Sequence, residues 1–142
     1  MSEYARETPE TLLQRCHEAL VRTRGVVMTL AWFDLVSHTL TWTGVGNVEG
    51  RLMRATAAPG VAPESALIKG GVVGYSLPNV RPTTTELHTG DTLVMATDGI
   101  SSAFSRSLVA GVAAQQLAER ILAEHGRGTD DALVVVVRAT LE

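Results

Sequence analysis

The sequence is poor in cysteine and in positive charge. Cys16 is the single cysteine among 142 residues, which excludes a disulfide framework and a zinc site built from several thiolates. The chain carries 12 Lys and Arg against 15 Asp and Glu, for a formal net charge of -3, and its basic residues are scattered. Because a nucleic-acid-binding protein shows a basic patch or stripe, the composition predicts no nucleic-acid partner.

Long hydrophobic runs and a secretory signal are also absent from the sequence. No apolar run approaches the roughly 18 residues that a membrane-spanning helix needs. The first ten residues, MSEYARETPE, are polar and acidic. Together with the lone cysteine, which fits a reducing compartment, this predicts a cytoplasmic protein without a membrane partner. A length of 142 residues suits a single domain over residues 1–142, large enough to bury a core without a structural metal.

The spacing of apolar and turn residues predicts two helices and a run of strands. The first helix is expected to begin after Thr8 as its N-cap, with Pro9 at its first position, and to end at Gly25. Further elements are expected at 26–33, 39–43, 48–54, 66–68, 83–87 and 92–96 as strands, 108–126 as a helix and 130–139 as a strand. The strands at 83–87 and 92–96 are expected to pair as a hairpin. Helices that are separate from consecutive hairpin strands favour an α+β fold with antiparallel sheets.

Two of the most apolar strands carry acids at their ends. Asp98 follows the strand in GDTLVMATDGIS, and Asp130 and Asp131 precede the strand in DDALVVVV. If these strands are antiparallel neighbours, the carboxylates converge and repel each other. A hard divalent cation such as magnesium or manganese relieves that repulsion, because it prefers oxygen ligands. The residues alone leave two interpretations open, a metal site or an Asp-Gly turn with a cap before a strand.

Other polar residues are further candidates for parts of a site. Gly44-Val45-Gly46-Asn47 lacks the third glycine and the following helix of a phosphate-binding loop, which favours a hairpin turn. Glu49 is expected on a solvated strand face, and the four histidines have no metal-ligand spacing. A phosphate clamp needs a cation near the acids. Arg127, three residues before Asp130, could steer phosphate, although loop arginines are usually solvated; Arg106 is a weaker candidate.

The segments GDTLVMATDGI and RGTDDALVVVVR resemble two C-terminal motifs of the metal-dependent serine/threonine protein phosphatases (PPM family), in the SpoIIE-like and RsbX-like branch. The segment ETLLQRCHEALVRTRGVVMTLAWFDLVSHTLTWTGVGNVEGRL also resembles the corresponding part of RsbX-like proteins. The resemblance covers residues 9–137. Its specificity comes from the order and spacing of all these motifs together.

The resemblance implies an antiparallel β-sandwich flanked by helices, with a metal centre at one end. It implies hydrolysis of phosphoserine or phosphothreonine by metal-bound water, with manganese or magnesium as cofactor, Asp98 and Asp130 as metal ligands and no side-chain nucleophile. Asp131 occupies a variable position and is not assigned as a ligand. The implied partner is a phosphorylated signalling protein of the stressosome or a partner-switching pathway.

The family's N-terminal Asp-Gly motif, whose Asp bridges two metals, has no counterpart in this sequence. No Asp precedes Asp34, which is expected at a hairpin turn. Without that Asp, Asp98 and Asp130 would hold at most one metal. The usual N-terminal strands are also missing, so open sheet edges are expected to favour a homo-oligomer.

Several explanations of this departure stay open. The chain is an N-terminally truncated phosphatase domain, a catalytically inactive phosphatase-like module that binds a partner, or a phosphatase in which another acid fills the role. A small-ligand-binding domain whose acids are only caps is a further alternative.

Overall fold

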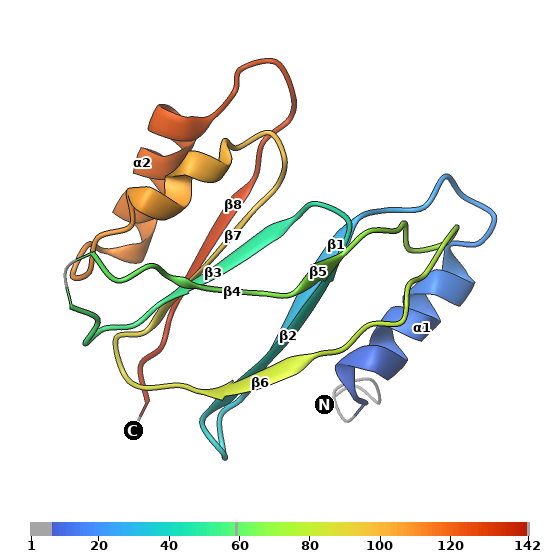
Figure 1. The fold of residues 1–142 in the computed structure, drawn as a ribbon, viewed down its shortest axis with the longest axis horizontal. Helices are drawn as coiled ribbons and strands as arrows, with labels where there is room; N and C mark the ends of the chain where they lie inside the picture. Colours follow the sequence, from blue (N-terminus) through green and yellow to red (C-terminus); the bar gives the residue numbers. More distant parts are fainter. Residues whose placement is uncertain (1–6, 59, 142) are drawn as a thin grey trace.

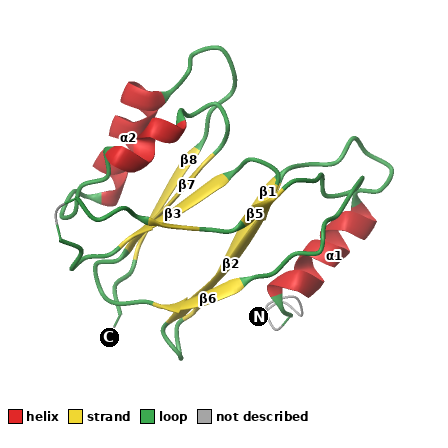
Figure 2. Ribbon diagram, viewed as in Figure 1, coloured by secondary structure: helices red, strands yellow, loops and turns green. Residues whose placement is uncertain are grey.

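The structure is a computed structural model that describes residues 7–58 and 60–141. Two four-stranded sheets are stacked face to face, and a helix covers the outer side of each (Figure 1, Figure 2). The elements in chain order are α1 (Pro9–Ala19), β1 (Met28–Asp34), β2 (Thr39–Val45), β3 (Glu49–Met53), β4 (Glu64–Ser65), β5 (Ile68–Lys69), β6 (Thr83–Glu86), β7 (Thr92–Ala96), the 3₁₀ helix η2 (Ser102–Arg106), α2 (Ala114–His125) and β8 (Val134–Arg138).

The first helix begins as its sequence predicts. The side chain of Thr8 accepts a hydrogen bond from the Thr11 N–H at 3.2 Å, and Pro9 occupies the first turn, where no N–H partner is needed. Leu13 is fully buried and packs with Val45 and Val73, so α1 covers the sheet formed by β1, β2, β5 and β6.

The second sheet has the order β4-β3-β7-β8, and its strand β7 is covered on both faces. Leu93 packs with Trp42 in the interior between the two sheets, whereas the next residue, Val94, packs with Phe104 and Leu117 under α2. Successive side chains of a strand point to opposite faces, so a strand covered on both sides is apolar throughout. This accounts for the continuous apolar run of β7.

The predicted hairpin of the strands at 83–87 and 92–96 is wrong. β6 pairs antiparallel with β2, and β7 pairs antiparallel with β3 and β8, so the connection between them crosses from one sheet to the other. Asp91 lies at this crossing and is only 2% exposed. Its carboxylate accepts hydrogen bonds from the N–H groups of Ala55 and His88 and from Arg54, which ties the crossing to the end of β3.

Two smaller expectations also differ from the structure. The second helix begins at Ala114 rather than at 108, because Gly111 has a φ of +83° that a helix does not accommodate. Its Leu122 is 49% exposed, and η2 lies between Gly99 and this helix. The single strand expected at 66–68 is replaced by β4 and β5, and β5 pairs parallel with β2.

Each sheet has an open edge. In the part of the chain that the structure describes, β1 pairs only with β2 and β8 only with β7. The homo-oligomer expected from open edges stays a prediction. None of the described helices is long and apolar enough to cross a membrane.

Candidate functional site

The pairing of β7 with β8 brings the two acidic chain segments together. Their antiparallel register places Ala96 opposite Val134, so the C-terminal end of β7 lies beside the N-terminal end of β8. Beyond the strands, the Thr97 N–H donates to the Leu133 carbonyl at 3.1 Å, and the Leu133 N–H donates to Thr97 Oγ1 at 2.9 Å. The sequence prediction that these strands are antiparallel neighbours is therefore confirmed.

Gly99 allows the two acidic segments to touch. A Cβ atom at this position would lie 2.1 Å from the Asp131 carbonyl oxygen, far inside van der Waals contact. A glycine is therefore required for the backbone after Asp98 to approach the backbone of Asp131 so closely. This close approach accounts for the glycine that follows Asp98 at the end of β7.

A cavity of about 300 Å³ lies at this end of the sandwich. Asp98 and Asp130, the two predicted site residues, both line it, and so does Asp131. All three acids are exposed. The remaining lining residues are Val27, Asn47, Val48, Thr97, Ala132 and Leu133.

Asn47 is a site residue that the sequence interpretation missed. Its Nδ2 donates to Asp98 Oδ2 at 3.0 Å, which fixes the orientation of that carboxylate. The pairing of β3 with β7 places Glu49 opposite Ala96, and the same register continued past both strand ends places Asn47 opposite Asp98. The hairpin turn that the sequence favours over residues 44–47 is wrong, because β2 and β3 lie in different sheets and the turn connects them. The available signal for Asn47 was its position directly before β3.

The carboxylates that line the cavity suit a hard cation, although they are few. Asp130 Oδ1 accepts a hydrogen bond from the Asp131 N–H at 2.8 Å. None of the ion pairs found within residues 7–58 and 60–141 involves Asp98, Asp130 or Asp131. Within the same residues, no three His, Cys, Asp or Glu side chains converge on one ion position. Magnesium is commonly held by one or two carboxylates and several waters, and Asp98 and Asp130 fit that arrangement.

Two other acids named in the sequence analysis, Glu49 and Asp34, lie in different environments. Glu49 is not a solvated strand residue, because it pairs with Arg51 at 2.9 Å and accepts a hydrogen bond from Ser102. Asp34 closes the β1–β2 turn as predicted. Hydrogen bonds from the N–H groups of Ser37 and Val36 lower the pKa of Asp34. Asp34 is therefore a turn residue rather than a member of the site.

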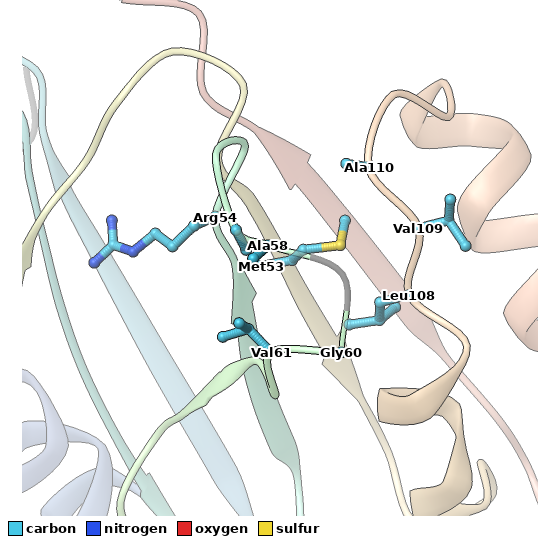
Figure 3. Close-up of a pocket in the computed structure, with 9 residues that line it drawn as sticks. Met53, Arg54, Ala58, Gly60, Val61, Leu108, Val109 and Ala110 are labelled. Carbon is cyan, nitrogen blue, oxygen red and sulfur yellow. The ribbon is translucent and has the colours of Figure 1, made fainter.

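A second cavity, of about 310 Å³, lies between the loop after β3 and the loop before α2 (Figure 3). Val61, Leu108 and Val109 line it, and the guanidinium of Arg54 points away from them. That guanidinium is bound by Glu64 and Asp91. The described residues that line this second cavity are mainly apolar and include no acid, base or nucleophile.

The two stacked sheets between helices form the fold of PP2C-type phosphatase domains. The chain belongs to the SpoIIE family, because the family model for stage II sporulation protein E (SpoIIE) matches residues 1–140. A search of curated proteins found no significant match.

Solved structures with the same fold include a chain from the bacterial stressosome, a modular system adapted to control secondary messenger signalling. It is 25% identical with a TM-score of 0.80, over 95% of this chain and 70% of that chain. RsbX in complex with magnesium is 19% identical with a TM-score of 0.80, over 94% and 65% of the two chains. The phosphatase domain of the cell fate determinant SpoIIE from Bacillus subtilis is 19% identical with a TM-score of 0.60, over 100% and 76%.

These matches confirm the predicted family and the predicted α+β sandwich. The chain spans between 65% and 76% of the length of the three structures. The assignment of Asp98 and Asp130 as metal ligands stays a prediction that the geometry of the cavity supports.

Proposed function

We propose that the chain hydrolyses phosphoserine or phosphothreonine on a signalling protein, with manganese or magnesium held at the cavity of Asp98 and Asp130. The observation that carries this proposal is the β7–β8 pairing, which brings two acidic segments to one cavity. Membership of the SpoIIE family and the likeness to RsbX, solved with magnesium, support the reaction type and the cofactor.

Some residues of the cavity would bind the cation, and another orients a residue that binds it. Asp98 and Asp130 would hold the cation. When bound, such a cation supplies positive charge opposite the phosphoryl oxygens and makes a water more acidic. Asn47 keeps the Asp98 carboxylate in one orientation through its amide hydrogen bond. Phosphoryl transfer depends mainly on positioning and charge stabilisation, so no side-chain nucleophile is needed.

The openness of the site and the structural neighbours support a protein substrate. Asp98 and Asp130 are exposed, so a phosphorylated side chain on the surface of another protein can reach them. One structural neighbour comes from the stressosome, and another is RsbX. We therefore place the substrate among phosphorylated proteins of a stressosome or partner-switching pathway, in the cytoplasm.

The reaction is tested by phosphate release from a phosphoserine peptide. We expect turnover with manganese or magnesium, loss of turnover when EDTA is added, and recovery when the metal is restored in excess. A chain that releases no phosphate with either metal would contradict the proposed hydrolysis.

A catalytically inactive binding module is the second candidate function. It is favoured by the small number of possible metal ligands, because no group of three His, Cys, Asp or Glu side chains among the described residues could hold a metal ion. This alternative predicts that a phosphorylated partner binds equally well with and without EDTA, and equally well to Asp98→Asn. The phosphatase proposal predicts that both changes weaken binding of the phosphorylated form.

Asn47→Ala should weaken manganese binding by about tenfold, because groups that orient a metal ligand typically contribute 10–100-fold to affinity. The amide that holds Asp98 Oδ2 is removed, while both carboxylates remain. Calorimetric titration with manganese measures the change. Asn79→Ala is the matched control, since Asn79 is an exposed residue outside the cavity. An unchanged affinity in Asn47→Ala would mean that the amide does not support a ligand.

A further inference from the structure

Arg127 is fixed by two hydrogen bonds to the turn that carries Asp98. Its backbone N–H donates to the Gly99 carbonyl at 2.9 Å, and its side-chain Nε–H donates to the Asp98 carbonyl at 3.1 Å. Arg127 also lies on the loop between α2 and β8 that carries Asp130. The loop thus places a guanidinium beside a residue that lines the acidic cavity.

The hydrogen bond to Asp98 uses only one edge of this guanidinium. An arginine side chain has five N–H donors, and Nε accounts for one of them. Among residues 7–58 and 60–141, no hydrogen bond or ion pair was found for the two Nη groups of Arg127, and the residue is exposed. The Nη donors form a planar fork whose geometry matches two phosphate oxygens.

Other cations of the sandwich are engaged away from the cavity. Their bonds within the described residues satisfy local carboxylates, hydroxyls or carbonyls. These pairs are Arg51 with Glu49, Arg54 with Glu64 and Asp91, Lys69 with the Asn79 carbonyl, and Arg138 with Thr92. Arg106 lines a different cavity, with Met53 and Val61. Of the cations named here, Arg127 is the one that hydrogen-bonds to the turn carrying Asp98.

A phosphate group entering this cavity meets a surface dominated by negative charge. Asp98, Asp130 and Asp131 all line it, and a phosphomonoester is itself a dianion near neutral pH. A held cation offsets part of this repulsion, but the phosphoryl oxygens also need donors that fix their direction. An arginine keeps its charge at every working pH and offers such donors in a rigid plane.

We propose that Arg127 binds the phosphoryl group of the substrate, with its Nε–H anchored on the Asp98 carbonyl and its Nη groups turned to the phosphate oxygens. This inference rests on the proposed function for its choice of cavity and ligand. It assigns phosphate binding to Arg127, for which the sequence left both phosphate steering and a solvated loop position open.

The test measures binding without requiring turnover. Inorganic phosphate and a non-hydrolysable phosphonate analogue of a phosphoserine peptide are titrated calorimetrically into the chain with manganese present. The proteins are the wild type, Arg127→Gln, Arg127→Lys and the control Arg120→Gln. Arg120 is an exposed arginine of α2 outside the cavity. We expect Arg127→Gln to weaken binding of both probes by about tenfold, Arg127→Lys to recover part of the loss, and Arg120→Gln to match the wild type.

A separate titration with manganese alone distinguishes binding from a structural role. If Arg127 binds phosphate, its removal leaves manganese affinity and the melting temperature close to those of the wild type. Parallel losses of manganese and phosphate affinity would show that Arg127 only supports the turn and would overturn the inference. Equal phosphate binding by wild type and Arg127→Gln, or no phosphate binding by the wild type, would also overturn it.

The two proposals fail in different experiments. If the wild type binds phosphate through Arg127 but releases none from the phosphoserine peptide, the catalytic proposal fails and the binding role remains. If the wild type hydrolyses the peptide and Arg127→Gln does so with unchanged KM and phosphate inhibition, the binding role fails alone.

Discussion

Asp98→Asn should lower the manganese-dependent kcat/KM toward a phosphoserine peptide by about 100-fold or more. The substitution keeps the size of the side chain but removes a negative charge at the cavity that Asp98 shares with Asp130. A bound cation contributes several kcal/mol to charge stabilisation in such reactions, and each 1.36 kcal/mol is about a tenfold change in rate. Initial rates of phosphate release at saturating manganese measure the effect.

Two aspartates serve as controls for Asp98→Asn. Asp131 lines the same cavity but is not assigned as a ligand, and Asp34 closes a turn between β1 and β2. Asp131→Asn and Asp34→Asn are expected to retain activity within a few-fold of the wild type. If Asp98→Asn kept wild-type activity with an unchanged manganese requirement, the cavity at the β7–β8 ends would not be the catalytic centre.

The position of the candidate site could be predicted from the sequence because it depends on two apolar strands. The apolar runs identify β7 and β8 as strands, although only β7 is buried. Acids at the end of one strand and the start of the other meet when the two pair antiparallel. Asn47 could not be assigned in the same way. Its contact with Asp98 depends on the register between β3 and β7, and the local sequence of a Gly-Asn turn carries no information about that register.

In the fold, too, features set by neighbouring residues could be predicted from the sequence, whereas features set by distant residues could not. The cap of α1 is local, so Thr8 and Pro9 fix the start of the helix. The pairing of β6 is not local. Thr89-Gly90-Asp91 has the composition of a hairpin turn, but the carboxylate of Asp91 is bound by Arg54, a residue 37 positions away in the chain. A contact of this separation cannot be read from the local sequence, so the pairing partners of β6 and β7 could not be predicted from it.

Asp91→Asn should lower the free energy of unfolding by about 3 kcal/mol. Both carboxylate oxygens accept hydrogen bonds, so an amide NH2 in place of one of them removes the ion pair's negative charge and leaves a buried donor without an acceptor. Asp91 is 2% exposed, and its Oδ2 lies 2.8 Å from Arg54 Nη1. Urea denaturation at neutral pH measures the loss. Glu64→Gln is the matched control, since it removes the other acid partner of Arg54 at a side chain that is 47% exposed. Pairs with exposed partners contribute about 1 kcal/mol or less.

The pH dependence of the difference in unfolding free energy between wild type and Asp91→Asn tests whether the charge of Asp91 causes that difference. Burial alone would raise the pKa of Asp91, but the N–H groups of Ala55 and His88 and the Arg54 guanidinium outweigh it and hold the pKa below its ordinary value of 3.8. Between the folded and unfolded pKa values the unfolded chain binds more protons, so stability rises with pH there. The contribution is present in full above the unfolded pKa and is lost as the pH falls through the folded pKa.

The stability gap between wild type and Asp91→Asn should therefore be constant near neutrality and shrink below about pH 4. A gap of the same size at all pH values would assign the effect of Asp91 to packing and neutral hydrogen bonds rather than to its ion pair with Arg54.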